Sequence, residues 1–174
     1  PILANYTEPV PVGSVMRALC VGRVEHSNSP EFKNGEFVTG PFGWQDYAMV
    51  EAKTVQRKLT DPQLPISTAL GVLGLNGLTA YFGLLDAAEP KPGETVMVST
   101  AAGSVGSAVG QIAKIKGCRA VGIAGGAGKV KQSLEEFGFD AAMDYKAGEL
   151  DKAIARSEEH TSELQSHHDL VCRL

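Results

Sequence analysis

The most regular hydrophobic pattern of the chain lies between residues 94 and 155. Three short apolar runs have the length and β-branched content of buried strands: ETVMVS (94–99), CRAVGIA (118–124) and DAAMDY (140–145). Apolar residues at helical spacing follow each run, in segments 103–117, 129–138 and 147–155, and glycines close the first two. This alternation predicts a parallel sheet with right-handed crossover helices, a partial Rossmann-type α/β fold.

The first 65 residues have a different pattern, with short β-type runs separated by glycine and proline. Residues 15–27 and 45–52 read as strands, with EFVTG between them, and Asn34-Gly35 is a hairpin-type turn signal. We therefore expect part of a small β-barrel domain over residues 1–65 and the partial Rossmann domain over 66–155. In the second domain, Ser67 is expected to cap a helix that continues through residues 79–88.

A glycine-rich loop follows the first predicted strand of the Rossmann part. Ala101-Ala102-Gly103-Ser104-Val105-Gly106 is a G-x-G-x-x-G pattern with alanine at its first position. Gly103 allows a pyrophosphate to approach the backbone, whereas Gly106 and Gly110 allow the helix to lie close to the strand. Free N–H groups at the helix N-terminus then bind the anion. Small residues for helix packing alone are the alternative, and the strand–loop–helix context favours dinucleotide binding.

The second strand indicates which dinucleotide is bound. NAD sites usually place an acidic residue at the end of this strand, to bind the ribose 2′-hydroxyl. Residues 123–126 are Ile-Ala-Gly-Gly, and Lys129 follows them. A cation without a nearby acid suits a 2′-phosphate, so we expect NADPH. A solvated helix face is the alternative reading for Lys129, and the one we favour for Lys131.

Composition and charge count against several classes of function. The formal net charge of −4 disfavours nucleic acid as a partner, since phosphate backbones require a basic face. No apolar run is long enough to cross a bilayer, and no secretory leader is recognisable. Three widely spaced cysteines, without a C-x-x-C pair, favour free thiols in a reducing cytoplasm. The chain begins at Pro1, and we expect a piece truncated at both ends.

The last 19 residues, Arg156 to Leu174, differ abruptly in character. They contain three of the four histidines and Cys172, which would permit a metal site. However, RSEEHTSELQSH resembles the translation of a common sequencing-library adapter, and Asp169 to Leu174 resembles its continuation after a variable index. We therefore expect residues 156–174 to be an artefact with irregular or arbitrary structure. Leaving out their two basic and four acidic residues changes the formal net charge from −4 to −2.

Residues 1–155 resemble the zinc-independent medium-chain dehydrogenases/reductases, specifically the prostaglandin reductase (leukotriene B4 dehydrogenase) and curcumin reductase group. The segments that carry the resemblance are GWQDY (43–47), LGVLGLNGLTAYFGLLD (70–86), PKPGETVMVSTAAGSVGSAVGQIAKIKGC (90–118), GIAGGAGK (122–129) and GFDAAMDYK (138–146). The resemblance implies a partial GroES-like β-barrel domain before the Rossmann domain. It also implies an oxidoreductase that uses NADPH to reduce the C=C bond of enones or enals, and a homodimer of the full-length protein.

The resemblance also assigns roles to individual residues. Its phosphate loop corresponds to Gly103, Ser104, Val105 and Gly106, and its 2′-phosphate lysine to Lys129. A tyrosine at the adenosine end corresponds to Tyr145. Asn76 and Thr79 correspond to residues near the nicotinamide, although Thr79 could instead face its own helix. The active-site tyrosine in a Y-x-x-P-V setting corresponds to Tyr6, for which an ordinary tyrosine near a chain end is the alternative.

Zinc-dependent alcohol dehydrogenase chemistry is not expected. The Gly-His-Glu motif of zinc-dependent relatives is replaced by Gly13-Ser14-Val15, the four-cysteine structural lobe is missing, and His26 reads as a surface residue. Phe42, Trp44 and Tyr47 could line an apolar substrate pocket, with barrel core as the favoured reading of Tyr47. Two other functions stay open: a quinone reductase of the same superfamily, and a non-catalytic NADPH-binding protein with a structural or nucleic-acid-binding role.

Overall fold

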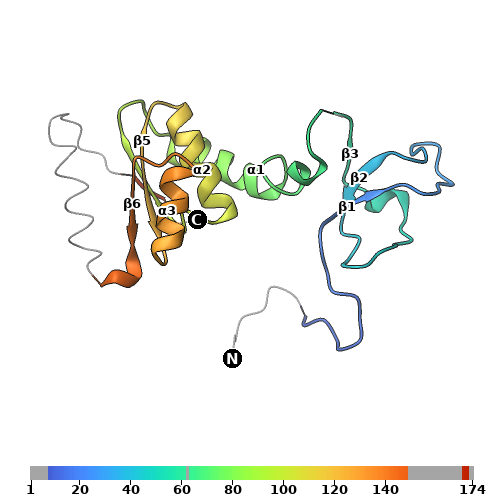
Figure 1. Cartoon of the computed structure of the whole chain (residues 1–174). Coiled ribbons are helices and arrows are strands. Elements are labelled where there is room, and N and C mark those ends of the chain that lie inside the picture. The colour runs from blue at the N-terminus through green and yellow to red at the C-terminus, as the bar shows by residue number, and fades with distance from the viewer. Residues whose placement is uncertain (1–7, 62, 149–169, 173–174) are drawn as a thin grey trace. The chain divides into compact units, whose positions relative to one another are not determined.

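The computed structural model describes residues 8–61, 63–148 and 170–172 (Figure 1). The chain divides into two compact units, Pro1–Leu70 and Gly71–Leu174, which are called the N-terminal and the C-terminal unit below.

The N-terminal unit is built on a three-stranded antiparallel sheet in the order β1-β2-β3. Its strands are β1 (Cys20–Arg23), β2 (Phe37–Gly40) and β3 (Arg57–Leu59), and its 3₁₀ helices are Ala52–Thr54 and Ile66–Ala69. The predicted turn between β1 and β2 is present, with Gly35 at φ +89° and its N–H bonded to the Val24 carbonyl.

Three sequence-based expectations for residues of the N-terminal unit are wrong. Residues 45–52 do not form a strand, because no described segment pairs with them, and Trp44 and Tyr47 are 81% and 83% exposed. The core reading of Tyr47 therefore fails, whereas the Phe42 ring does pack against the small sheet at Gly22 and Gly40. Ser67 is not an N-cap, because it lies inside the 3₁₀ helix that follows Pro65.

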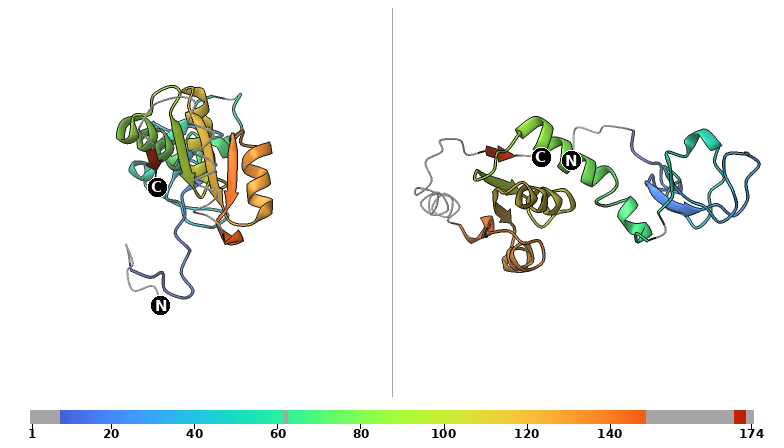
Figure 2. Two further views of the ribbon diagram at one scale, coloured as in Figure 1. Left: turned by 90° about the vertical axis from the view of Figure 1, so that its left-hand side faces the viewer. Right: turned by 90° about the horizontal axis from the view of Figure 1, so that it is seen from above.

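The C-terminal unit has the predicted parallel sheet, in the order β6-β5-β4-β7 (Figure 2). Its elements in chain order are α1 (Leu75–Phe82), a π-helical turn (Gly83–Ala88), β4 (Thr95–Ser99), α2 (Ser104–Ile115), β5 (Arg119–Ala124), α3 (Ala127–Glu135), β6 (Ala141–Asp144), the 3₁₀ turn Tyr145–Ala147 and β7 (Leu170–Cys172). The three predicted strands and α2 agree closely with the sequence pattern, and α3 covers residues 127–135 where 129–138 was predicted. The helix predicted for residues 147–155 lies almost entirely outside the described residues. Gly117, at φ +78°, ends α2 with a Schellman motif, since Cys118 N–H bonds to the Ala113 carbonyl.

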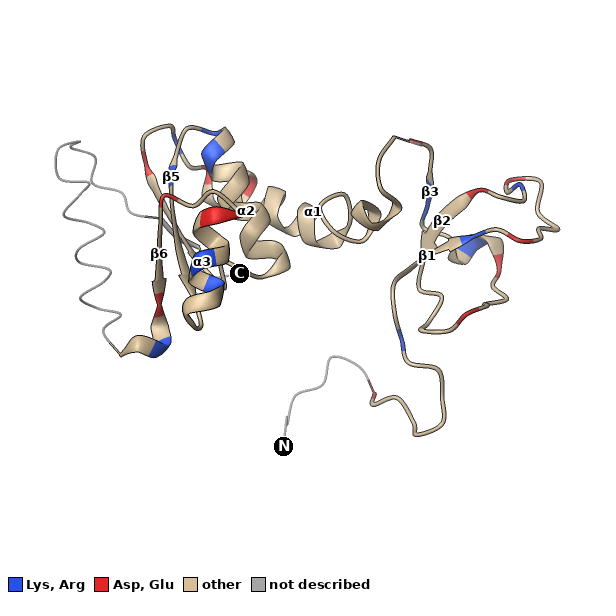
Figure 3. Ribbon diagram, in the orientation of Figure 1, with Lys and Arg blue, Asp and Glu red and all other residues tan. Residues whose placement is uncertain are grey.

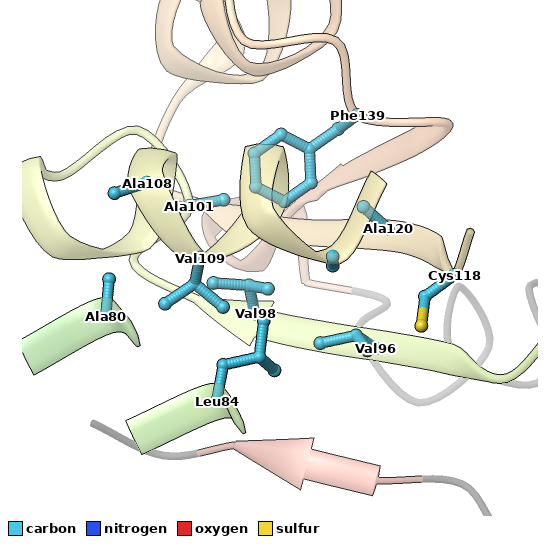
Figure 4. Packing of buried hydrophobic residues seen from close by; sticks show 11 residues of the cluster. Ala80, Leu84, Val96, Val98, Ala101, Ala108, Val109, Cys118, Ala120 and Phe139 are labelled. Atoms are coloured by element: carbon cyan, nitrogen blue, oxygen red, sulfur yellow. The ribbon is translucent and has the colours of Figure 1, made fainter. Parts of the chain in front are cut away.

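Burial of alternate residues of the strands defines two faces of this sheet. Val96 and Val98 of β4 pack with Leu84, Ala80 and Val109, as Figure 4 shows, and these five residues are at most 2% exposed. A second cluster is formed by Met97, Val121 and Met143. Met97 lies between Val96 and Val98 along β4, so its side chain points to the opposite face of the sheet. The first cluster fixes α2 against β4 and thereby places the loop between them.

The expectation of irregular structure for residues 156–174 is wrong for three residues. Leu170–Cys172 form β7, which pairs in parallel with Val96–Val98 of β4. The physical reason is that the edge of β4 presents unpaired backbone groups, to which a short run of β-forming residues can bond. The rest of this segment lies outside the described residues.

Candidate dinucleotide-phosphate site

The loop between β4 and α2 forms the floor of the candidate site. Ala101 N–H bonds to the Ile123 carbonyl, which fixes the loop to β5, and Gly103 is the N-cap residue of α2. The first helical bond runs from Ser107 N–H to the Gly103 carbonyl at 2.9 Å. The N–H groups of Ser104, Val105 and Gly106 therefore precede the helical ladder, and within the described part of the chain no carbonyl accepts them. They form the anion-binding helix terminus that the sequence predicts.

Contacts around the loop glycines explain why larger residues do not fit there. A Cβ at Gly106 would lie 2.3 Å from the Thr100 carbonyl oxygen, and one at Gly103 would lie 3.0 Å from the same atom. The loop also contains a strained residue, because Thr100 is β-branched and has φ +54°. The expected role of Gly110 needs a correction: a Cβ there would meet the Phe139 ring at 2.2 Å, so the glycine makes room for that ring and not for a strand.

A pocket of about 110 Å³ lies at the carboxyl ends of the strands, next to this loop. Its lining combines three segments: Thr100, Ala102 and Gly103; Ala124, Gly125 and Lys129; and Tyr145 and Lys146. Ligand pockets commonly measure about 300–1,000 Å³, so this pocket matches one end of an extended ligand. A larger hollow of about 390 Å³ in the N-terminal unit contains none of the predicted site residues.

Two lysines of α3 that the sequence left ambiguous differ in their surroundings. Lys131 forms an ion pair with Glu135, with 3.8 Å between Nζ and Oε2, and is well exposed, as expected of a solvated helix face. Lys129 lines the pocket and forms no ion pair within the described residues. The segment that follows β5 contains no acidic residue, since Gly125 and Gly126 come directly after the strand. The Asp144 carboxylate bonds to Gly126 N–H but does not line the pocket. The pocket thus combines a helix N-terminus with an unpaired cation, which suits a phosphate group.

The turn after β6 supplies the third side of the pocket, and sequence reasoning found only part of it. The Tyr145 ring lies against Gly125, where a Cβ would be 2.8 Å from the ring. Asp144 Oδ1 accepts hydrogen bonds from Gly126 N–H at 2.8 Å and from Lys146 N–H at 2.9 Å. These two bonds lower the pKa of Asp144 below its ordinary value. Lys146 could have been found from its position just after a parallel strand, where ligand-binding residues gather.

The remaining predicted site residues lie elsewhere or outside the description. Asn76 and Thr79 are on α1, which packs against α2, and neither lines the pocket. The Thr79 hydroxyl donates to the Leu75 carbonyl of its own helix at 2.8 Å. Tyr6 lies outside the described residues, as do His160, His167 and His168.

The described residues add two findings on metals and membranes. They contain no group of three metal-capable side chains close enough to bind an ion, and Cys20 and Cys118 are free thiols. Among these same residues, none of the helices has the length and hydrophobicity required to span a bilayer.

Comparisons with known proteins give a consistent result for both units. Residues 3–57 match a family model described as the N-terminal domain of oxidoreductase. The chain is 46% identical to the NADPH-dependent curcumin reductase of Escherichia coli over 153 residues, which are 88% of this chain and 44% of that protein. It is 48% identical to prostaglandin reductase 1 of Sus scrofa over 136 residues, which are 77% of this chain and 41% of that protein.

The crystal structure of CurA from Vibrio vulnificus in complex with NADPH matches with a TM-score of 0.79 and 43% identity, over 91% of this chain and 47% of that one. The chain thus spans less than half the length of each of these three proteins. The agreement extends over the β-rich N-terminal unit and the Rossmann-type sheet. The chain belongs to the zinc-independent medium-chain dehydrogenase/reductase family, of which it carries part of the GroES-like domain and part of the Rossmann domain.

Proposed function

We propose that the chain is part of an NADPH-dependent oxidoreductase that reduces the C=C bond of α,β-unsaturated ketones and aldehydes. One observation carries the cofactor assignment: the pocket at the ends of β4, β5 and β6 combines the N-terminus of α2 with Lys129, and no acid follows β5. A carboxylate at that position would repel a 2′-phosphate, whereas an unpaired ammonium group attracts it.

The residues present also fit the rest of a dinucleotide. Gly103 and Gly106 leave the backbone open beside the free N–H groups of α2, where a pyrophosphate is expected to bind. The half-exposed Tyr145 ring offers an apolar surface at the adenosine end. Asn76 and Thr79 are proposed to lie near the nicotinamide, on the resemblance to the family alone.

NADPH supplies a hydride when it is bound, and the protein supplies position and electrostatics. As the β-carbon of the substrate is reduced, negative charge develops on the carbonyl oxygen, which requires a hydrogen-bond donor because no metal is expected here. We propose that the Tyr6 hydroxyl donates this bond, and a proton must then reach the α-carbon. The exposed aromatic side chains of Trp44 and Tyr47 are candidates for contact with an apolar substrate.

Names of the relatives support this substrate class. A curcumin reductase and a prostaglandin reductase are among the curated proteins that match, and a 2-alkenal reductase of Nicotiana tabacum matches with 41% identity over 145 residues. We propose by extension that an enone or enal is the small-molecule substrate.

The test is steady-state turnover of a simple enone by the full-length protein that contains this sequence, with NADPH and with NADH. We expect a clear preference for NADPH and a loss of about 10-fold or more in kcat/KM for NADPH with Lys129→Ala, since charge-assisted hydrogen bonds contribute roughly 1.5–3 kcal/mol. Lys131→Ala, on the same helix, is the matched control and should change little. Equal efficiency with both cofactors would contradict the cofactor assignment.

The same assay distinguishes the other functions. Turnover of quinones in preference to enones would identify a quinone reductase, and NADPH binding without turnover of either would identify a non-catalytic protein. Tyr6→Phe should lower kcat more than it raises KM, because the hydroxyl acts on charge that develops during the reaction.

Three further expectations belong to this proposal. The free thiols of Cys20 and Cys118 are consistent with a reducing cytoplasm, and the family resemblance supports a homodimer of the full-length protein. Residues 156–174 are proposed to derive from a sequencing adapter. Resequencing of the source gene across codon 155 tests this origin, and an uninterrupted genomic match through codon 174 would overturn it.

A further inference from the structure

The turn after β6 brings a second lysine to the phosphate pocket. Lys146 lines the same pocket as Lys129, although it belongs to a different segment of the chain. Figure 3 shows a basic position directly after the acidic end of β6. Within the described residues, Lys146 Nζ forms no ion pair, and it lies 5.9 Å from the centroid of the Tyr145 ring. The ring therefore holds the ammonium group beside the pocket through a weak cation–π contact.

Asp144 is the nearest acid in sequence, and its hydrogen bonds go to the backbone. Its Oδ1 accepts both the Gly126 and the Lys146 N–H groups, and no bond joins it to the Lys146 ammonium group in the described structure. The carboxylate thereby connects the end of β6 to the loop between β5 and α3. This connection fixes the Tyr145–Ala147 turn, and with it Lys146, next to the segment that carries Lys129.

A phosphate monoester is the ligand whose charge matches this arrangement. The monoester carries about −1.5 to −2 at pH 7, whereas each phosphate of a pyrophosphate diester carries a single charge. One lysine leaves much of the monoester charge unbalanced, and two lysines balance it.

We propose that Lys146 is a specificity-determining residue, which together with Lys129 binds the 2′-phosphate of the cofactor, and that Asp144 is its positioning residue. This inference rests on the proposed use of NADPH. It adds a second cation, from the turn after β6, to the one that the family resemblance assigns.

The test is equilibrium binding of two nucleotides that correspond to the adenosine end of the cofactor, called the two cofactor fragments below. Adenosine 2′,5′-bisphosphate and adenosine 5′-monophosphate differ only in the 2′-phosphate. Isothermal titration calorimetry on the full-length protein that contains this sequence gives both dissociation constants for the wild type and for Lys146→Ala, Lys146→Arg and Lys131→Ala. We expect Lys146→Ala to weaken binding of the bisphosphate about 5-fold or more, since partly exposed charge pairs contribute up to roughly 1 kcal/mol and bonds to charged groups more. Binding of the monophosphate should change less than 2-fold.

Two controls separate charge from structure. Lys146→Arg retains the cation and should restore most of the preference for the bisphosphate, and Lys131→Ala should leave both constants unchanged. Asp144→Asn should weaken bisphosphate binding although it removes a negative charge, because the amide is a poorer acceptor for the two backbone N–H groups. If Lys146→Ala does not fold, Lys146→Gln gives the same comparison.

The outcomes also separate this inference from the proposed function. A wild-type chain that binds both fragments equally would overturn the NADPH assignment, and the role of Lys146 with it. A wild type that prefers the bisphosphate, together with a Lys146→Ala variant that retains the full preference, would overturn the role of Lys146 alone. A stronger bisphosphate affinity in Asp144→Asn would show that Asp144 opposes the anion through its charge, and would overturn its role as a positioning residue.

Discussion

The two units of the chain differ in how their hydrophobic residues are used. In the C-terminal unit, Val96, Val98 and Val109 are almost completely buried between β4, β5 and α2. In the N-terminal unit, Val38 and Ala69 are the buried hydrophobic residues among those described, whereas Val12, Trp44 and Met49 are largely exposed. The C-terminal unit therefore has a core that fixes its loops. The N-terminal unit has few buried hydrophobic side chains among its described residues, so its structure depends more on backbone hydrogen bonds between its three short strands.

The largest effect that this comparison predicts concerns Gly106 of the C-terminal unit. Gly106→Ala places a Cβ 2.3 Å from the Thr100 carbonyl oxygen, which is a backbone atom, so the loop or the helix must shift within a packed region. We expect a loss of about 3 kcal/mol in the free energy of unfolding, or loss of the folded unit. Urea unfolding followed by circular dichroism at 222 nm measures it, because α1, α2 and α3 all lie in this unit.

Gly128→Ala is the matched control for Gly106→Ala. Gly128 lies in α3, and a Cβ there would have no heavy atom within 4 Å. Alanine should therefore leave the stability unchanged or raise it by about 0.5–1 kcal/mol, through its better helix propensity. Similar losses for both variants would show that contacts at the loop do not determine the cost.

An effect of intermediate size on the free energy of unfolding is expected when valine is replaced by alanine in the C-terminal unit and not in the N-terminal unit. Val109→Ala removes two methyl groups from a completely buried site and should cost about 2 kcal/mol in the free energy of unfolding. Val12→Ala, at a completely exposed site of the N-terminal unit, should change it by less than about 0.5 kcal/mol. Chemical denaturation measures both. A cost at Val12 equal to that at Val109 would mean that Val12 is buried in solution, and the contrast between the units would no longer hold.

Sequence reasoning succeeded where local periodicity and tertiary structure agree. The strands at 94–99, 118–124 and 140–145 and the helices between them could be predicted because their apolar residues recur with strand or helix periodicity. In the structure, the strand residues are buried in two clusters, and α2 packs on the first of them. Gly103, Lys129 and Tyr145 meet in one pocket because the carboxyl ends of parallel strands share one edge. The sequence could not predict Asp144, because its role depends on a hydrogen bond to Gly126, which is remote in sequence.

The N-terminal unit was harder to predict for the same physical reason. β3 carries no apolar alternation, and it is a strand because Phe37–Thr39 of β2 pairs with it. Residues 45–52 have suitable β propensity but lack a partner among the described residues. Strand formation depends on pairing with distant residues, so propensity alone is a weak guide there.

The smallest effect expected concerns acid stability. Among the described residues, each unit contains a carboxylate that binds a lysine side chain and a backbone N–H group. In the C-terminal unit, burial raises the pKa of Asp140, but hydrogen bonds from the Lys114 side chain and from Ala120 N–H, together with the positive charge nearby, lower it more. In the N-terminal unit, the Lys33 N–H group and the Lys58 side chain lower the pKa of Glu36. A lowered pKa in the folded state means that the stabilisation is complete above the unfolded-state value, near 4, and is lost as the pH falls through the folded value.

Asp140→Asn removes the pH dependence that this carboxylate contributes to the stability of the C-terminal unit, and Glu36→Gln does the same in the N-terminal unit. Asp140 joins α2 to β5 through Lys114 and Ala120, whereas the Glu36 carboxylate joins a turn to one strand residue, Lys58. We therefore expect Asp140→Asn to reduce the loss of helical stability between pH 5 and pH 3 measurably, and Glu36→Gln to leave it unchanged. Urea unfolding at a series of pH values, followed at 222 nm, measures both slopes. An acid slope unaltered by Asp140→Asn would show that the hydrogen bonds of Asp140 do not determine the acid stability of the C-terminal unit.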